Sequence, residues 1–382
     1  MSEPSTNSLP QATDAAAAAP SEDNLADLGP IPGFRAVIMA GGQGQRFWPL
    51  STADRPKQFL DLGRSGRTLI QSTYDRVLPL AGDPAHVYVA TARRYVGLVC
   101  EQLPDVPLEN LLVEPTPRDS APAIALACLT IAKRHGEAVT GFFSSDHRIG
   151  PGFHEAIRAA AGVAQDRGGL VTVGITPTRP ATGYGYIEVG EPAGAGYTVK
   201  RFVEKPSART AETYLATGGY LWNAGIFVWR TRDVLTELDR RAPDLMLPLR
   251  SAFEAGAVAE RFGELPRISI DYALMERTDR AHVVPGRFEW DDIGDWGALE
   301  RLVAHDGSNT VVGRHIGHDA SGNIVYTEDE GDVVVTLGVN DLVIVKRGHA
   351  LLLVHKDRVQ EIKTLLADER LVELLREPAR KR

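Results

Sequence analysis

RAVIMAGGQGQRFWPLSTADRPKQFLDL, residues 35–62, opens the patterned part of the chain. Its first six residues, Arg35–Ala40, form an apolar run with the length of a buried strand. Gly41, Gly42 and Gly44 follow at once, and glycines let the backbone turn sharply and approach a ligand closely. A strand that runs directly into a glycine loop is typical of α/β folds, where ligands bind beyond the carboxyl ends of the strands.

Short apolar runs and longer amphipathic runs alternate downstream of this stretch. Strands are predicted at 35–40, 86–91, 110–115 and 170–175, with a further strand that runs into a loop at 139–147. Helices are predicted at 68–80, 93–103, 121–136 and 154–169, with Thr68 as an N-cap and Gly136 as a helix end. The alternation predicts a Rossmann-like α/β domain whose mixed, mostly parallel sheet is covered on both faces.

The pattern changes near Thr310, where short strands punctuated by turns begin. A β-rich unit closed by a helix at about Arg358–Leu375 is therefore predicted. Residues 1–33 are rich in Ala, Ser, Pro and acids, and they predict a disordered tail. The expected organisation is thus a tail at 1–33, an α/β domain at 34–305 and a β-rich domain at 306–382.

Composition excludes several classes of protein. The 382 residues are 43% hydrophobic and 24% charged, as in an ordinary globular protein, and the net charge of -8 argues against nucleic-acid binding. Cys100 and Cys128 match no disulfide or metal spacing, and Cys128 is predicted to be a core residue. The sequence contains neither a membrane-spanning run nor a secretory signal, so a cytoplasmic location without a membrane partner is expected.

The glycine loop matches neither of the two best-known phosphate loops. The dinucleotide pattern fails because Phe47 stands where the third glycine is required, and the P-loop pattern also fails. Arg46 and Lys57 follow the loop, and two fixed cations beside a glycine loop suit a triphosphate. The alternative is a tight turn with two surface cations.

Carboxylates follow two other predicted segments. Asp146 stands at the end of a strand, and Asp291, Asp292 and Asp295 are flanked by tryptophans. Clustered carboxylates need a neutralising partner, and Mg²⁺ takes one or two carboxylates together with substrate phosphates. A helix cap or a surface acidic turn would explain the same residues.

A further set of polar and small residues suits a sugar. Glu204 and Asn223 can bind hydroxyl groups, while Gly185 and Gly225 let the backbone approach a ring. Lys205 could bind the sugar's phosphate. A solvated Glu204–Lys205 pair and a turn at Asn223 are the alternatives.

Ordered motifs from about Arg35 to Asp357 then make a family resemblance clear. They are the Gly41-Gly42-x-Gly44-x-Arg46 loop with WPLS, and RPKQF, EPTPRDSAPAIALA, SDH, TGYGYI, FVEKP, YLWNAG, SIDYALME and WDDIGDW. Together they resemble the mannose-1-phosphate guanylyltransferases of the sugar-phosphate nucleotidyltransferase superfamily. The resemblance implies a GT-A-like nucleotidyltransferase domain with a small C-terminal unit similar to a left-handed β-helix, and it suggests a homodimer.

The resemblance also implies roles at matching positions. Arg46 and Lys57 would be catalytic, stabilising phosphate charge, and Asp146 and Asp292 would hold Mg²⁺. The nucleotide would be bound by Gly41, Gly42, Gly44, Glu114, Arg118 and Ser120, and the sugar phosphate by Gly185, Glu204, Lys205 and Asn223. The expected reaction joins GTP and mannose 1-phosphate into GDP-mannose and diphosphate by in-line attack, without a covalent enzyme intermediate.

Glu114 is predicted to choose the base. It ends a strand, and a carboxylate can accept two hydrogen bonds from the N1–H and amino group of guanine. Uracil, thymine and adenine do not offer this pair of donors. A surface charge at a strand end is the alternative reading of Glu114.

The chain departs from the family at Asp119, at Ser144-Ser145 and at Ala224, where relatives often have Asn, Pro-Ala and Ser. The long relatives' cupin-type isomerase domain is not expected here. Two other functions stay open: a relative that uses another base or sugar, and a catalytically silent regulatory subunit that senses nucleotide sugars. The failed glycine spacing argues against a dinucleotide-dependent oxidoreductase.

Overall fold

The computed structural model describes residues 29–42, 44–303, 305–306 and 308–376, and the chain forms two compact units. Unit 1 contains residues 1–41, 73–144 and 149–290, and unit 2 contains residues 42–72, 145–148 and 291–382. The units cut across the domain boundary predicted at 305/306, because the loop after the first strand packs with the C-terminal residues.

Only the last five residues of the predicted disordered tail, 29–33, belong to the described part of the chain. Residues 1–28 lie outside it. Ile31 is buried, and its backbone N–H donates to the carbonyl of Leu80 at 2.9 Å. The prediction of disorder for residues 29–33 is therefore wrong.

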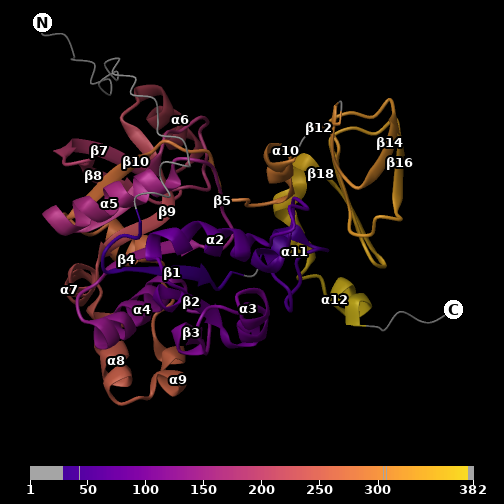
Figure 1. The fold of residues 1–382 in the computed structure, drawn as a ribbon. Coiled ribbons are helices and arrows are strands. Elements are labelled where there is room, and N and C mark those ends of the chain that lie inside the picture. Colours follow the sequence, from indigo (N-terminus) through magenta and orange to yellow (C-terminus); the bar gives the residue numbers. More distant parts are fainter. Residues whose placement is uncertain (1–28, 43, 304, 307, 377–382) are drawn as a thin grey trace, which may run out of the picture. The chain divides into compact units, whose positions relative to one another are not determined.

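A mixed sheet forms the centre of unit 1 (Figure 1). Its strands are β1 (Phe34–Ala40), β2 (Val87–Ala92), β3 (Leu111–Glu114), β4 (Val139–Ser144), β6 (Leu170–Ile175), β7 (Tyr186–Ala193), β8 (Gly196–Val203), β9 (Tyr220–Arg230) and β10 (Ala281–Gly286). Their order is β3-β2-β1-β4-β9-β6-β10-β8-β7. The neighbours from β3 to β4 are parallel, as are β6 and β10, whereas β9 is antiparallel to both β4 and β6. The predicted α/β class with a mixed sheet is confirmed.

The helices of this part of the chain largely follow the sequence prediction. They are α2 (Leu69–Ala81), α3 (Val96–Gln102), α4 (Ser120–His135), α5 (Phe153–Arg167), α6 (Ala208–Thr217), α7 (Thr231–Arg241), α8 (Pro243–Glu254) and α9 (Val258–Arg261). Thr68 caps α2, because its hydroxyl accepts from the Gln71 backbone and the Gln71 side chain accepts from the Thr68 backbone. Gly136 ends α4 with a φ of 70°, as predicted.

Alternate residues of β4 point to opposite faces of the sheet. The Phe142 ring contacts Trp229 at 5.4 Å between centroids, on the face where residues of α4, α7 and α8 form the core. The next residue, Phe143, contacts Phe153 of α5 at 5.6 Å on the other face. Cys128 of α4 is fully buried, which confirms its predicted place in the core.

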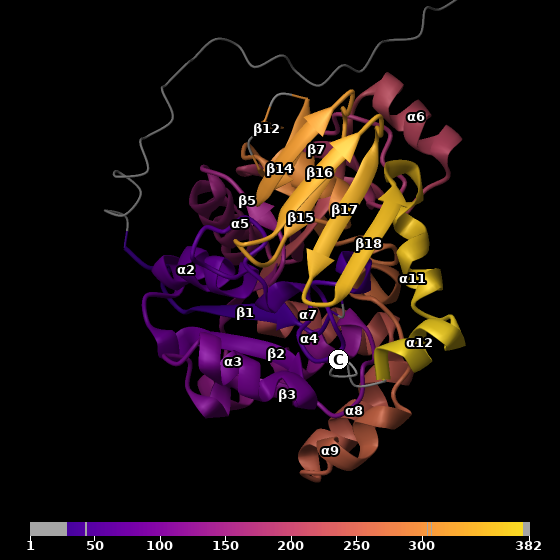
Figure 2. The same ribbon diagram turned by 90° about the vertical axis from the view of Figure 1, so that its right-hand side faces the viewer.

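Unit 2 is β-rich beyond residue 308, as predicted. Its strands are β12 (His305–Asp306), β13 (Asn309–Val312), β14 (Arg314–His318), β15 (Ile324–Thr327), β16 (Val333–Leu337), β17 (Leu342–Arg347) and β18 (Ala350–His355). From β13 to β17, successive strands alternate between two parallel ladders, β13-β15-β17 and β14-β16 (Figure 2). This alternation is the arrangement of a β-helix. The two-residue strands β5 (Arg148–Ile149) and β11 (Trp290–Asp291) pair separately.

The predicted closing helix is interrupted. A 3₁₀ turn at Lys356–Glu361 leads into α11 (Ile362–Leu365), and α12 (Glu369–Arg376) follows; the remaining short helix of unit 2 is α10 (Leu299–Leu302). The Asp368 carboxylate accepts from the backbone N–H of Arg370 at 3.0 Å. Asp368 thus acts as an N-cap that starts a new helix, a role typical of aspartate, which the amphipathic pattern alone did not reveal.

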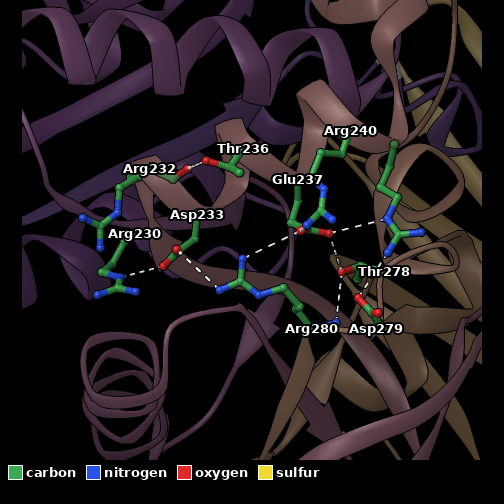
Figure 3. Close-up of polar contacts among 10 residues, drawn as sticks. Arg230, Arg232, Asp233, Thr236, Glu237, Arg240, Thr278, Asp279 and Arg280 are labelled. Carbon is green, nitrogen blue, oxygen red and sulfur yellow. Dashed lines mark hydrogen bonds and ion pairs between the residues drawn. The ribbon is translucent and has the colours of Figure 1, made fainter.

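A buried polar network fixes α7 in unit 1 (Figure 3). The Glu237 side chain is 0% exposed, accepts from the Thr278 hydroxyl at 3.0 Å and is paired with Arg240 at 3.3 Å. Arg280 lies 3.7 Å from Glu237 and also 3.7 Å from Asp233, so it bridges two acids of the same helix. The network joins α7 to the segment that enters β10.

We expect Glu237→Ala to lower the free energy of unfolding by about 1–3 kcal/mol, because it leaves the Thr278 hydroxyl without its acceptor and removes the common partner of Arg240 and Arg280. Urea unfolding measures the change. Glu212→Ala, at an exposed position of α6, is the matched control and should have little effect. A loss below about 1 kcal/mol for Glu237→Ala would mean that the network adds no stability.

None of the helices in the described part of the chain has both the length and the apolar character that a membrane crossing requires.

Candidate active site

In unit 2, Lys57 binds a cluster of oxygen atoms from three other residues: Asp146, Asp292 and Ile293. Its side chain is 6% exposed and its ammonium is 2.8 Å from the Asp146 carboxylate. The ammonium also donates to the backbone carbonyls of Asp292 at 3.0 Å and Ile293 at 2.6 Å. A lysine has three N–H donors, and all three are used here. Lys57 is therefore not a surface cation, and it connects the two predicted metal carboxylate positions.

The glycine loop is shaped around Lys57. Gly44 has a φ of 55°, and a Cβ there would lie 2.9 Å from the Lys57 backbone nitrogen, so a larger residue would displace the lysine. The buried Gln58 donates from its side chain to the Gly42 carbonyl at 2.9 Å. Sequence reasoning missed Gln58, although it lies within the RPKQF motif. Gly42 has open space around it, as the prediction of close ligand approach requires.

Trp296 holds the rest of this loop in place. Its ring contacts Phe47 at 5.2 Å, and its indole N–H donates to the Trp48 carbonyl at 3.1 Å. Arg46, between the loop glycines and Phe47, is exposed. Unit 2 therefore presents one exposed and one buried cation from the same short segment.

The three acids of the WDDIGDW motif have different surroundings. The Asp291 carboxylate accepts from the Ile293 backbone at 2.8 Å and pairs with Arg301. Asp295 caps a turn by accepting from the Gly297 backbone at 2.8 Å. Asp292 lies beside Gly294, where a Cβ would be 3.1 Å from its carboxylate. The three acids of this motif therefore differ in their backbone contacts.

The donors fit Mg²⁺ by their chemistry. Asp146 and Asp292 carry hard carboxylate oxygens. Both residues bind the Lys57 ammonium, Asp146 through its carboxylate and Asp292 through its backbone carbonyl. No group of three or more potential metal-ligating side chains occurs among the described residues. Two carboxylates nonetheless suit Mg²⁺, which usually completes its shell with phosphates and waters.

Ile293 adds backbone strain at this point. Its φ is 46°, a left-handed conformation that is rare for a β-branched residue. The Lys57 ammonium and the Asp291 carboxylate both bind the Ile293 backbone. Such strain persists where surrounding contacts fix the geometry, and it is common at functional sites.

Glu114 is buried in unit 1 beside the first glycine of the loop. It is 7% exposed, and a Cβ on Gly41 would lie 3.5 Å from its carboxylate. Burial raises the pKa of Glu114 to about 7, and the charge of Asp119 adds to the rise. The reading of Glu114 as a surface charge is therefore wrong.

The start of α4 carries the other predicted nucleotide residues. Asp119 has a φ of 69° and caps the helix by accepting from the Ser120 backbone at 2.8 Å. This gives the departure at Asp119 a structural reason. The Ser120 hydroxyl accepts from the Ile270 backbone at 2.8 Å, and the buried Nε of Arg118 has no hydrogen-bond partner in the described chain.

The predicted sugar-binding residues do lie together in unit 1. A Cβ on Gly185 would lie 2.5 Å from the Glu204 carboxylate and 3.3 Å from Asn223, so only glycine fits there. Lys205 pairs with Glu204 at 2.9 Å, while the Asn223 backbone donates to the Gly185 carbonyl at 2.8 Å. Asn223 is buried in β9 rather than in a turn.

Asp271 joins this group and was missed in the sequence. The Asn223 side-chain amide donates to its carboxylate at 3.0 Å. Burial raises the pKa of Asp271 to about 7, with a further contribution from the charge of Glu204. The SIDYALME motif contains Asp271, but only its contact with Asn223 marks it as part of the site.

Family comparison accounts for nearly all of the described chain. Residues 35–309 match the nucleotidyl transferase family, and residues 313–368 match the MannoseP isomerase/GMP-like beta-helix domain. The chain belongs to the nucleotidyl transferase family. The second match agrees with the parallel ladders of unit 2.

Individual relatives of this nucleotidyl transferase are similar over most of its length. A mannose-1-phosphate guanylyltransferase of Escherichia coli K12 is 38% identical, covering 86% of this chain and 72% of the relative. One from Klebsiella pneumoniae is 40% identical with the same coverage of each chain. A Thermus thermophilus structure described as a mannose-1-phosphate geranyltransferase has a TM-score of 0.81 and 38% identity, covering 89% of this chain and 99% of its own.

Proposed function

We propose that this nucleotidyl transferase joins GTP and mannose 1-phosphate into GDP-mannose and releases diphosphate. The observation that carries the proposal is its 37–40% identity to mannose-1-phosphate guanylyltransferases over 86% of the chain. The polar groups of both units support it, since each predicted set of residues has the chemistry its role needs.

The proposed reaction is a single displacement. A phosphate oxygen of mannose 1-phosphate attacks the α-phosphorus of GTP, a new P–O bond forms, and the bond to diphosphate breaks. Diphosphate leaves with its bonding electrons, so no oxidant or covalent intermediate is needed. Such a transfer depends on positioning and charge neutralisation, which Arg46 and Lys57 would supply.

Asp146 and Asp292 would hold Mg²⁺, which neutralises phosphate charge when it is bound. Lys57 fixes both residues, through the carboxylate of Asp146 and the carbonyl of Asp292. A phosphate oxygen could reach the Lys57 ammonium only by replacing one of its present acceptors. We infer that Lys57 positions the acids, while the exposed Arg46 contacts phosphate directly.

Glu204, Lys205 and Asn223 would hold mannose 1-phosphate. The Glu204 carboxylate can accept from sugar hydroxyls, and Lys205, whose side chain is 59% exposed, can reach the phosphate. Asn223 uses one of its two amide hydrogens on Asp271, which leaves one for a ligand.

No observation favours a catalytically silent subunit, since all the proposed catalytic and metal residues are present.

The raised pKa of Glu114 predicts a pH dependence for GTP. Guanine needs the ionised carboxylate, and the ionised fraction grows as pH rises through about 7. Below this value kcat/KM for GTP should fall about tenfold per pH unit, and above it the value should level off. Steady-state rates from pH 5.5 to 9 would measure this profile, and Glu114→Gln should remove the step. Asp271 titrates in the same range, but its effect should fall on KM for mannose 1-phosphate.

A homodimer and a cytoplasmic location are part of the proposal. β14 and β16 expose a row of apolar side chains: Ile316, Val333, Val335 and Leu337. Val335 is 67% exposed, and such rows commonly mark protein interfaces. Light scattering should give a dimer mass for the wild type and a monomer mass for Val335→Glu; a monomeric wild type would contradict the dimer.

Omission of single components tests the reaction itself. Diphosphate release should require GTP, mannose 1-phosphate and Mg²⁺ together, and removal of any one should stop it. Equal release without mannose 1-phosphate would indicate simple hydrolysis of GTP and would contradict the proposed transfer.

A further inference from the structure

A cavity of about 380 Å³ lies in unit 1 apart from the residues discussed above. Its walls come from α2, from the segment 149–152 and from the first two turns of α5. Figures 1 and 2 show these two helices side by side. None of the proposed catalytic, nucleotide, sugar or metal residues lines this cavity.

Two arginines line the cavity, and neither forms an ion pair among the described residues, although the charge of Asp75 acts on Arg76. Arg76 lies over the Phe153 ring at 5.8 Å, and its guanidinium makes no hydrogen bond or ion pair with the described residues. Arg158 donates to the Gly29 carbonyl, while its Nε is fully buried and unpartnered in the described chain. Burial lowers the pKa of Arg76 to about 10, and the charge of Asp75 offsets only part of this effect.

The start of α5 adds to this positive potential. Gly152 precedes the helix and no side chain caps it, so the first backbone N–H groups are left for another acceptor. The N-terminus of a helix favours anions. The His154 Nε2–H donates to the Arg76 carbonyl at 2.7 Å, which connects α5 to α2. No acid occurs among the described residues that line the cavity, although Asp75 and Glu155 stand next to Arg76 and His154 in the sequence.

We propose that this cavity binds a small phosphate monoester. The forked donors of Arg76 and Arg158 match phosphate oxygens better than a single point charge would. Phe153 and Pro79 form apolar walls for the organic part of the ligand. The volume of about 380 Å³ suits a small metabolite and falls at the lower end of ligand pockets. The proposal does not depend on the nucleotidyl-transfer reaction.

Calorimetric titration with glycerol 3-phosphate, up to about 10 mM, tests the site. We expect the wild type to bind, and Arg76→Gln and Arg158→Gln each to bind at least about tenfold more weakly. Arg167→Gln, at the exposed far end of α5, is the matched control and should bind like the wild type. Thermal melts would establish that each variant is folded.

Two further variants keep the test decisive. Arg76→Lys retains the charge without the fork, so it should bind more weakly than the wild type and more tightly than Arg76→Gln. Lys205→Ala removes the cation of the sugar group and should leave this binding unchanged. The proposal is overturned if the wild type does not bind, or if Lys205→Ala rather than the arginine variants loses binding.

Discussion

Replacement of Lys57 by methionine should reduce kcat for diphosphate release by about a hundredfold, because misplacement of catalytic groups by about 1 Å can cost this much in rate. Methionine keeps the apolar stem that packs near Phe47 but cannot bind Asp146 or the carbonyls of Asp292 and Ile293. These three oxygens would lose their common partner. The proposed metal residues, Asp146 and Asp292, would then no longer be held at fixed positions by a shared partner.

The Lys57→Met result needs a control for stability, because loss of a buried charge also weakens folding. Circular dichroism melts would show whether the variant is folded at the assay temperature. Lys363→Ala, at an exposed position of unit 2, should keep full activity. A folded Lys57→Met protein with wild-type kcat would contradict the positioning role and leave Arg46 as the main cation.

Glu114→Gln should lower kcat/KM for GTP by about tenfold to a hundredfold, the usual cost of losing a two-point base contact. Glutamine offers one acceptor and turns a donor toward the donors of guanine. KM for mannose 1-phosphate should change little, because the residues proposed to bind it, Glu204 and Asn223, are different from Glu114. The ratio of GTP to ATP use should fall by a similar factor.

Steady-state kinetics with each nucleotide would measure the Glu114→Gln effect, with Glu109→Gln as an exposed control near the start of the same strand. Equal losses for GTP and for mannose 1-phosphate would mean that Glu114 supports the fold and does not read the base. The close approach of Gly41 to the Glu114 carboxylate makes such a general role the main competing explanation.

Local patterns in the sequence predicted much of this architecture. The strand at β1, the caps Thr68 and Gly136 and the core position of Cys128 all follow from residue chemistry that acts within one element. The proximity of Gly185, Glu204 and Asn223 was predicted by their shared suitability for a sugar, and the structure brings them together.

Features that depend on contacts between distant parts of the chain could not be predicted from the sequence. Asp271 belongs to the sugar group only because a side chain 48 positions earlier in the chain binds it. The burial of Lys57 depends on carbonyls 235 and 236 positions away, so the local pattern of charges left a surface cation open as an alternative. The grouping of residues 42–72 with the C-terminal residues in one compact unit likewise depends on distant contacts.

A competition assay tests the central claim most directly. GTP, ATP, UTP, CTP and dTTP at equal concentration would be incubated with mannose 1-phosphate, glucose 1-phosphate, Mg²⁺ and the purified chain. Mass spectrometry would then identify the nucleotide sugars that form. We predict that GDP-mannose is the main product, whereas a dominant UDP-, ADP- or dTDP-sugar, or GDP-glucose, would contradict the proposed base or sugar.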